Sequence, residues 1–140
     1  MKQKITLPLV IFLTSVLLLA ACGGTAEPVT GEIALEVGGT SFTMTTLEAM
    51  DTIVVESTKK DGTIVEYTGV PVMDVLEDAG LEGETVVFIA SDGYEAELAM
   101  SELEGCADCV VAFDDGELRM VLPGFPGSVQ VKGVIEINVK

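Results

Sequence analysis

Residues 53–80 read IVVESTKKDGTIVEYTGVPVMDVLEDAG, and this stretch decides the fold class of the chain. It opens with two runs rich in β-branched residues, 53–58 and 63–67, on either side of a turn that ends in Asp61-Gly62. Asp-Gly between two such runs is a strong signal for a β-hairpin, because its residues tolerate the positive φ angles of a tight turn. The first half of the stretch therefore predicts two antiparallel strands.

The second half of the stretch predicts a helix over residues 71–79. Pro71 suits the first turn of a helix, where the missing N–H of proline costs nothing. Apolar residues recur at i, i+3, i+4 and i+7, which makes one stripe along a helix, namely Val72, Val75, Leu76 and Ala79. Gly80 follows at the position where helices commonly end. A hairpin followed directly by a helix favours an α+β fold.

Strands and turns continue on both sides of this stretch. The sequence predicts three more hairpins: 33–37 with 41–44, 85–91 with 94–100, and 110–113 with 118–122. It also predicts two closing strands, 129–132 and 134–139. Thr45 with Glu48 and Ser101 with Glu104 fit the spacing of a capping box, so each pair predicts a single helical turn. The whole pattern predicts a strand-rich α+β domain with one clear helix.

The first 21 residues have the order of a secretory signal peptide. Lys2 and Lys4 supply positive charge, and residues 5–18 form an apolar run that is shorter than the roughly 20 residues a transmembrane helix needs. The sequence Leu19-Ala20-Ala21-Cys22 then resembles the lipobox of bacterial lipoproteins. The resemblance implies that Cys22 is acylated and becomes the mature N-terminus. The alternatives are an ordinary signal peptide, or a short anchor helix with a chance cysteine.

These features predict three segments: a signal peptide over 1–21, the lipidated Cys22 with a flexible tether over 22–31, and one domain over 32–140. The glycines and threonines of the tether, with Pro28, indicate a linker, and the remaining residues suffice for one core. We therefore expect a protein that is anchored by lipid to a bacterial cell membrane and faces the extracytoplasmic side.

The charge of the mature chain excludes several classes of function. Residues 22–140 keep all 23 acidic residues and only five of the seven basic ones, which gives a formal charge of −18. A nucleic acid would be repelled by such a chain. The chain has no histidine, which excludes Ser-His-Asp and Cys-His catalysis, and no EF-hand loop is present. We predict no catalytic residues and no metal site.

Three stretches in order resemble the oxidoreductase molybdopterin-binding domain of the sulfite oxidase family. The first is Tyr67-Thr68-Gly69-Val70-Pro71, followed by Val75-Leu76 and Ala79-Gly80. The second is Ala90-Ser91-Asp92-Gly93-Tyr94. The third is residues 119–124, followed by Gly127, Val131-Lys132 and 135–139. The resemblance covers roughly residues 42–140 and implies the mixed α+β fold of that family. It also implies that Arg119 and Lys132 help to hold a molybdopterin cofactor, since a guanidinium and an ammonium suit phosphate and pterin oxygens.

The chain departs from the family at the positions that carry its chemistry. The family's enzymes bind molybdenum through a cysteine upstream of the Gly-Val-Pro stretch, but residues 53–60 hold no cysteine. A hydroxyl or an ammonium does not replace a soft thiolate as a metal ligand. The family's histidine before the arginine is also missing. These departures leave open whether the protein is an enzyme, and they favour a module without the family's catalysis.

Two cysteines remain inside the domain, in the motif Cys106-Ala107-Asp108-Cys109. An even pair outside the cytoplasm predicts a structural disulfide. The alternative is a redox-active CxxC site, which the neighbouring acidic residues oppose, because they raise the pKa of a thiol. Structural zinc needs four ligands, which the chain does not offer here.

Three functions compete at this point. The first is a membrane-anchored binding or accessory module that recognises a small molecule or a protein partner in the cell envelope. The second is a redox protein or subunit that binds molybdopterin through Arg119 and Lys132. The third is a thiol-redox lipoprotein that uses Cys106 and Cys109.

Overall fold

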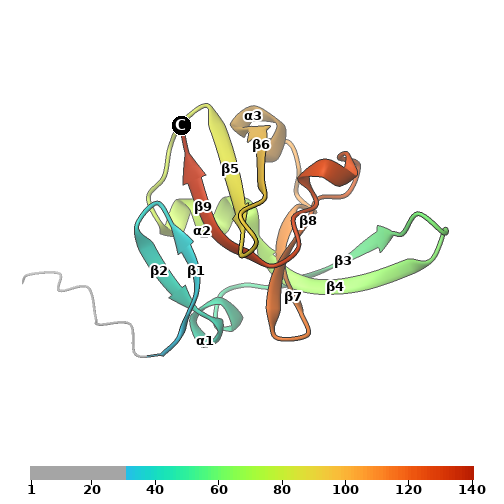
Figure 1. The fold of residues 1–140 in the computed structure, drawn as a ribbon, viewed down its shortest axis with the longest axis horizontal. Helices are drawn as coiled ribbons and strands as arrows, with labels where there is room; N and C mark the ends of the chain where they lie inside the picture. The colour runs from blue at the N-terminus through green and yellow to red at the C-terminus, as the bar shows by residue number, and fades with distance from the viewer. Residues whose placement is uncertain (1–30) are drawn as a thin grey trace, which may run out of the picture.

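The computed structural model describes residues 31–140, so the predicted signal peptide, Cys22 and nearly all of the predicted tether lie outside the described residues. Within this range the chain folds into two β-sheets and three short α-helices (Figure 1). The prediction of a strand-rich α+β fold is therefore confirmed. None of the helices in the described part of the chain has the length and apolar character needed to cross a membrane.

The first sheet has five strands in the order β2-β1-β9-β5-β6. The strands are β1 (Ile33–Val37), β2 (Thr40–Thr43), β5 (Thr85–Ala90), β6 (Glu95–Ala99) and β9 (Val134–Val139). β1 and β9 run parallel, and every other neighbouring pair is antiparallel. The closing strand of the chain thus lies between two of the predicted hairpins and joins them into one sheet.

The second sheet is antiparallel, with four strands in the order β3-β4-β7-β8. The strands are β3 (Ile53–Thr58), β4 (Ile64–Pro71), β7 (Val110–Asp114) and β8 (Glu117–Val121). Only the last three residues of β4 pair with β7, and the rest of β4 pairs with β3 alone. The β3–β4 hairpin consequently projects from the body of the molecule as a two-stranded arm (Figure 1).

The main hydrophobic core takes one face of each sheet together with the helices. Phe88 of β5, Met120 of β8 and Leu76 are buried there. A second, smaller cluster lies on the opposite face of the four-stranded sheet and consists of Val55, Val110, Ala112 and Val121. Because alternate residues of a strand point to opposite faces, the four-stranded sheet separates the two clusters.

The predicted helix over 71–79 is observed as α2 (Val72–Asp78), one residue shorter at each end. Pro71 is the last residue of β4, paired with Val110, and it stands before the helix instead of inside its first turn. The prediction placed Pro71 wrongly because its fixed φ also suits the end of a strand. Gly80 ends the helix with a φ of +68°, as the sequence predicts.

Two predicted helical turns are observed as α1 (Met44–Glu48) and α3 (Met100–Glu104), but their caps differ from the prediction. Thr43 is the N-cap of α1, because its Oγ1 accepts a hydrogen bond from the backbone N–H of Thr46. Thr45 therefore lies inside the helix. α3 begins at Met100 after Ala99, and no side chain caps it.

The predicted strand over 129–132 is wrong. Residues Gly127–Val129 form a 3₁₀ helix, η1, and only a single bridge between Arg119 and Lys132 follows it. The reason is the side chain of Gln130, which bonds both the N–H and the carbonyl of Leu122. This side chain takes the place that a backbone ladder would occupy.

Candidate functional site

A pocket of about 480 Å³ lies on the outer face of the four-stranded sheet, and we call it the basic pocket. It is lined by Ser57, Thr58, Lys59, Lys60, Tyr67, Arg119, Val121, Gly127, Gln130 and Lys132. Its volume falls within the range of small-molecule sites in proteins. Four of the seven basic residues of the chain line it, although the chain carries 23 acidic residues.

The alternation of β8 explains how this face receives its side chains. Leu118 and Met120 point into the main core, so Arg119 and Val121 point the other way. Val121 belongs to the small apolar cluster, and Tyr67 of β4 packs against that cluster. The floor of the basic pocket is therefore apolar, and charged groups stand around it.

The arm supplies one side of the basic pocket. Lys59 and Lys60 stand at its tip, where the Lys59 N–H donates to the carbonyl of Thr63 at 2.8 Å. The carboxylate of Asp61 accepts a hydrogen bond from the Thr63 N–H at 2.9 Å, which closes the turn locally. That hydrogen bond, helped by other local hydrogen bonds and the nearby Lys59 charge, lowers the pKa of Asp61 below its usual 3.8.

Arg119 lines the basic pocket and is held in place by its neighbours. Its Nη1 donates to the hydroxyl of Tyr67 at 3.0 Å and to Oδ2 of Asp114 at 3.2 Å. The guanidinium carbon also lies 5.4 Å from the centre of the Tyr67 ring, in cation–π range. About a third of the side chain of Arg119 is exposed (29%). These contacts orient the guanidinium and leave its other N–H donors for a ligand.

The opposite wall is the segment that contains η1. Gln130 Oε1 accepts from the Leu122 N–H at 2.8 Å, and its Nε2 donates to the carbonyls of Leu122 and Phe125. The hydroxyl of Tyr94 donates to the Ser128 carbonyl at 2.7 Å, which ties the turn between β5 and β6 to η1. Hydrogen bonds from two directions therefore fix this wall.

The electrostatics of the basic pocket favour an anion. Ion pairs among residues 31–140 join Arg119 to Asp114 and Lys140 to Glu97, so Lys59, Lys60 and Lys132 have no carboxylate partner in that range. Unpaired ammonium groups around an apolar floor attract an anionic group and hold it by charge-assisted hydrogen bonds. A ligand with a phosphate or carboxylate group and a flat or apolar body fits this arrangement.

The two cofactor-binding residues predicted from the family resemblance lie together in the basic pocket. Arg119 and Lys132 are joined by a β-bridge, so both reach it from adjacent backbone. The sequence prediction missed Lys59, Lys60 and Tyr67, which the arm brings to the same place. The scarcity of basic residues after the predicted signal peptide was the feature that could have identified the lysines.

The donor atoms of the basic pocket do not suit molybdenum. Its side chains offer hydroxyls, amines, a guanidinium and an amide, and no thiol lines it. A soft metal held in the manner of the family needs a thiolate ligand. No group of three or more His, Cys, Asp or Glu side chains in residues 31–140 is placed to hold a metal ion. The residues present fit the anionic part of a pterin cofactor and not its metal.

The cysteine pair lies elsewhere in the fold. Cys106 and Cys109 are joined by a disulfide that closes the loop between α3 and β7. Cys109 is buried, with 1% of its surface exposed, and its carbonyl accepts a hydrogen bond from the Val72 N–H at 2.9 Å. The loop is thereby fixed to the start of α2, and neither cysteine lines the basic pocket.

A scan against protein-family models finds no match for this chain, and a search of curated proteins finds none either.

Proposed function

We propose that this protein is a lipid-anchored, extracytoplasmic binding module that holds an anionic small molecule in the basic pocket and does not catalyse a reaction. The observation that carries the proposal is the gathering of Lys59, Lys60, Arg119 and Lys132 at one hollow. In a chain with a formal net charge of −16, a cluster of four cations at one pocket favours the binding of an anion there. The lipid anchor rests on the lipobox resemblance at Cys22.

The proposal includes the fold of the sulfite oxidase family, with the family's chemistry lost. Support comes from the position of Arg119 and Lys132, which the resemblance implies as cofactor contacts and which share the basic pocket. Further support comes from the segment upstream of Gly69-Val70-Pro71. In the family this segment carries the metal-binding cysteine, and here it lines the pocket with Ser57 and Thr58 instead. Hydroxyls at that place suit an oxyanion and not a soft metal.

A redox protein that binds molybdopterin is the second candidate. The same convergence of Arg119 and Lys132 favours it, because both groups suit a phosphate and pterin oxygens. In that case the metal would need a ligand from a partner. A thiol-redox function has less support, since Cys109 is buried and carboxylates of Glu102, Glu104 and Asp108 surround the loop in sequence.

The first experiment measures cofactor content. The full chain is expressed in a host that makes molybdopterin, and the purified protein is analysed by elemental mass spectrometry and by fluorescence of oxidised pterin. We expect neither molybdenum nor pterin. Near-stoichiometric pterin that disappears in Arg119→Ala or Lys132→Ala would replace the binding-module proposal with the redox alternative.

The second experiment measures anion binding, with inorganic pyrophosphate as the probe in isothermal titration calorimetry. We expect saturable binding that Lys59→Ala and Lys132→Ala each weaken by about fivefold to tenfold, because each removes one charge-assisted contact of roughly 1–1.4 kcal/mol. Lys140→Ala is the matched control. It removes the same charge from a lysine that pairs with Glu97 outside the basic pocket, so affinity should change by less than about twofold. Equal losses in all three variants would show a non-specific charge effect and contradict the proposal.

A further inference from the structure

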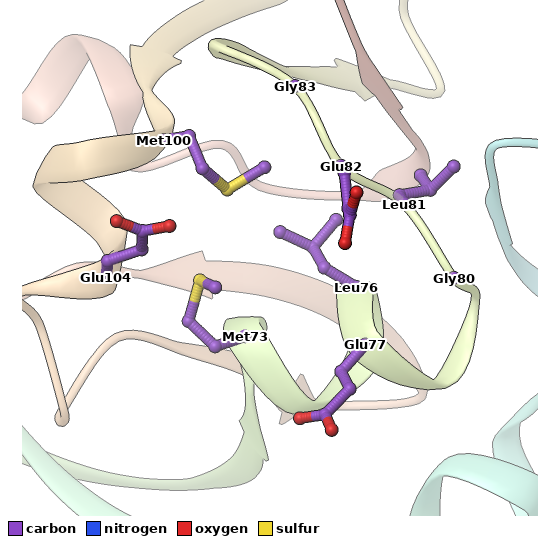
Figure 2. A pocket seen from close by; sticks show the side chains of 9 residues that line it. All are labelled: Met73, Leu76, Glu77, Gly80, Leu81, Glu82, Gly83, Met100 and Glu104. Atoms are coloured by element: carbon purple, nitrogen blue, oxygen red, sulfur yellow. The ribbon is translucent and has the colours of Figure 1, made fainter.

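A second pocket, lined by acidic and apolar residues instead of basic ones, lies between α2 and α3, and we call it the α2–α3 pocket. It encloses about 450 Å³ and is lined by Met73, Leu76, Glu77, Gly80, Leu81, Glu82, Gly83, Met100 and Glu104. Figure 2 shows these residues converging from α2, from α3 and from the segment between α2 and β5. No lysine or arginine is among them, in contrast to the basic pocket.

The walls of the α2–α3 pocket are fixed by the backbone. The Leu81 N–H bonds the carbonyl of Leu76 at 3.0 Å, and the Gly80 N–H bonds that of Glu77 at 2.9 Å. These two bonds form a Schellman motif, in which Gly80 supplies the left-handed residue. The pattern sets the direction in which the chain leaves α2, so the pocket does not depend on a flexible loop.

The other end of the segment between α2 and β5 is also fixed by backbone hydrogen bonds. The Met100 N–H donates to the carbonyl of Glu84 at 2.8 Å, and the Glu84 N–H donates to that of Lys140 at 2.9 Å. At Gly83, an added Cβ would lie 2.8 Å from the carbonyl oxygen of Lys140, so this backbone packs directly against the end of β9. A hollow with fixed walls binds a ligand without a cost for ordering those walls.

The interior of the pocket is apolar and adaptable. Met100 is buried, with 7% of its surface exposed, Leu76 is buried, and Met73 is half-buried. In Figure 2 the thioether ends of Met73 and Met100 border the same space from α2 and from α3. Methionine side chains are flexible and polarisable, so they fit apolar ligands of irregular shape. This part of the pocket suits a short hydrocarbon body.

The opening of the pocket is acidic. Glu82 and Glu104 are exposed, and Figure 2 shows their carboxylates directed toward the hollow from opposite sides, whereas that of Glu77 points away. None of these three glutamates forms an ion pair within residues 31–140. Two unpaired carboxylates beside an apolar interior select a ligand that has a positive charge next to a hydrocarbon group.

We propose that the α2–α3 pocket binds a small organic cation, an ammonium group attached to a short apolar chain. The ammonium lies between Glu82 and Glu104, and the apolar chain lies against Met73 and Met100. Anionic ligands are repelled by the glutamates, and neutral ones gain no charge pairing with them. This site is separate from the basic pocket, so the proposal does not rest on the proposed function.

The test follows the methionine methyl groups by NMR in the full-length protein labelled with ¹³C at those methyls. Hexylammonium is the probe, with hexanol and hexanoate as neutral and anionic analogues of the same chain length. We expect saturable shifts at Met73 and Met100 and no comparable shifts at Met44, Met50 and Met120. We expect hexanol to bind about tenfold more weakly and hexanoate not at all, because both lack the charge pairing.

The double variant Glu82→Gln/Glu104→Gln should weaken the binding of hexylammonium by about tenfold or more, and the fold is retained because both side chains are exposed. The matched control is Glu36→Gln/Glu66→Gln, which removes the same charge from exposed residues outside the pocket and should leave affinity within about twofold. The proposal is overturned if hexylammonium gives no saturable shift at Met73 and Met100. It is also overturned if the three probes bind equally, or if both double variants lose affinity alike.

Discussion

At the scale of single residues, Gly69 decides how the arm joins the body of the molecule. It is the first residue of β4 that pairs with β7, opposite Ala112. A Cβ at this position would lie 2.4 Å from the carbonyl oxygen of Val111 and 2.7 Å from the Cα of Ala112. Only a residue without a side chain allows this approach of two backbones. Gly69 thereby lets the end of β4 pair with β7, and the preceding residues of β4, Tyr67 among them, lie beyond that pairing in the arm.

Gly69→Ala should lower the free energy of unfolding by about 1–3 kcal/mol, because the added methyl group forces β4 away from β7. Urea denaturation followed by circular dichroism measures the change. Gly105→Ala is the control, since its added Cβ would meet only Glu102 and Ser101 oxygens at 3.7 and 3.8 Å. That variant should stay within about 0.5 kcal/mol of the wild type. Equal stability of the two variants would argue against a tight approach at Gly69.

At the scale of elements, two short segments give the basic pocket its shape: the tip of the arm and the segment around η1. Each is ordered by a side chain that bonds backbone. Asp61 closes the tip through the Thr63 N–H, and Gln130 holds η1 through Leu122. Both sets of hydrogen bonds join residues fewer than ten positions apart, so each wall of the pocket can be disturbed separately by mutation.

Gln130→Ala should destabilise the fold by about 1–3 kcal/mol, because Leu122 is buried and its N–H and carbonyl lose their partner. Thermal and urea unfolding measure the loss, and pyrophosphate affinity should fall as the wall loosens. Ser128→Ala, in the same segment, is the control, because Ser128 takes part in the hydrogen bond from Tyr94 through its backbone carbonyl. A neutral Gln130→Ala variant would mean that water replaces the side chain at no cost.

The turn at the tip of the arm should loosen in acid. The folded protein lowers the pKa of Asp61, chiefly through the hydrogen bond from Thr63, so this contribution to stability is complete above about pH 3.8, the unfolded value. It is lost as the pH falls through the lower, folded pKa. The amide shift of Thr63, followed by NMR from pH 6 downward, should change with a midpoint below 3.8. Asp61→Asn should abolish this titration, and a midpoint above 3.8 would contradict the hydrogen bond.

At the scale of the whole molecule, charge is distributed very unevenly. The formal net charge is −16, yet four basic residues line one pocket, and the α2–α3 pocket is lined by acidic and apolar residues alone. Like charges spread over a surface repel one another and oppose the compact state. The basic pocket therefore concentrates positive charge in a molecule whose surface as a whole repels anions.

Added salt should act in opposite directions on stability and on anion binding. Raising sodium chloride from 0.01 to 0.5 M shortens the Debye length from about 30 Å to well below 10 Å. Screening should raise the unfolding temperature by roughly 4 °C for each kcal/mol of repulsion that it removes. Over the same range the affinity for pyrophosphate should fall. Calorimetry at each salt concentration measures both, and a parallel change of the two would contradict this account of the charge distribution.

Local sequence predicted the secondary structure correctly wherever one turn or one apolar stripe of residues determines it. Glycine-containing turns located all four hairpins, namely Gly38-Gly39, Asp61-Gly62, Asp92-Gly93 and Asp115-Gly116. The apolar stripe from Val72 to Ala79 located α2. These signals work because backbone conformation at a turn or along a helix depends on neighbouring residues. Where a side chain from farther away competes, as Gln130 does with a strand at 129–132, the local pattern predicted the wrong element.

Composition also determined the acidic character of the domain, and the family resemblance implied Arg119 and Lys132 as a pair. Only the tertiary structure decided that Lys59, Lys60 and Tyr67 join them, because the strand order β3-β4-β7-β8 brings the arm and the η1 segment to the same pocket. The α2–α3 pocket was likewise not predicted from the sequence, because Met73 and Met100 come together only where α2 packs beside α3. Pockets form between elements that are distant along the chain, and the physical information that brings those elements together lies in packing and not in any local pattern.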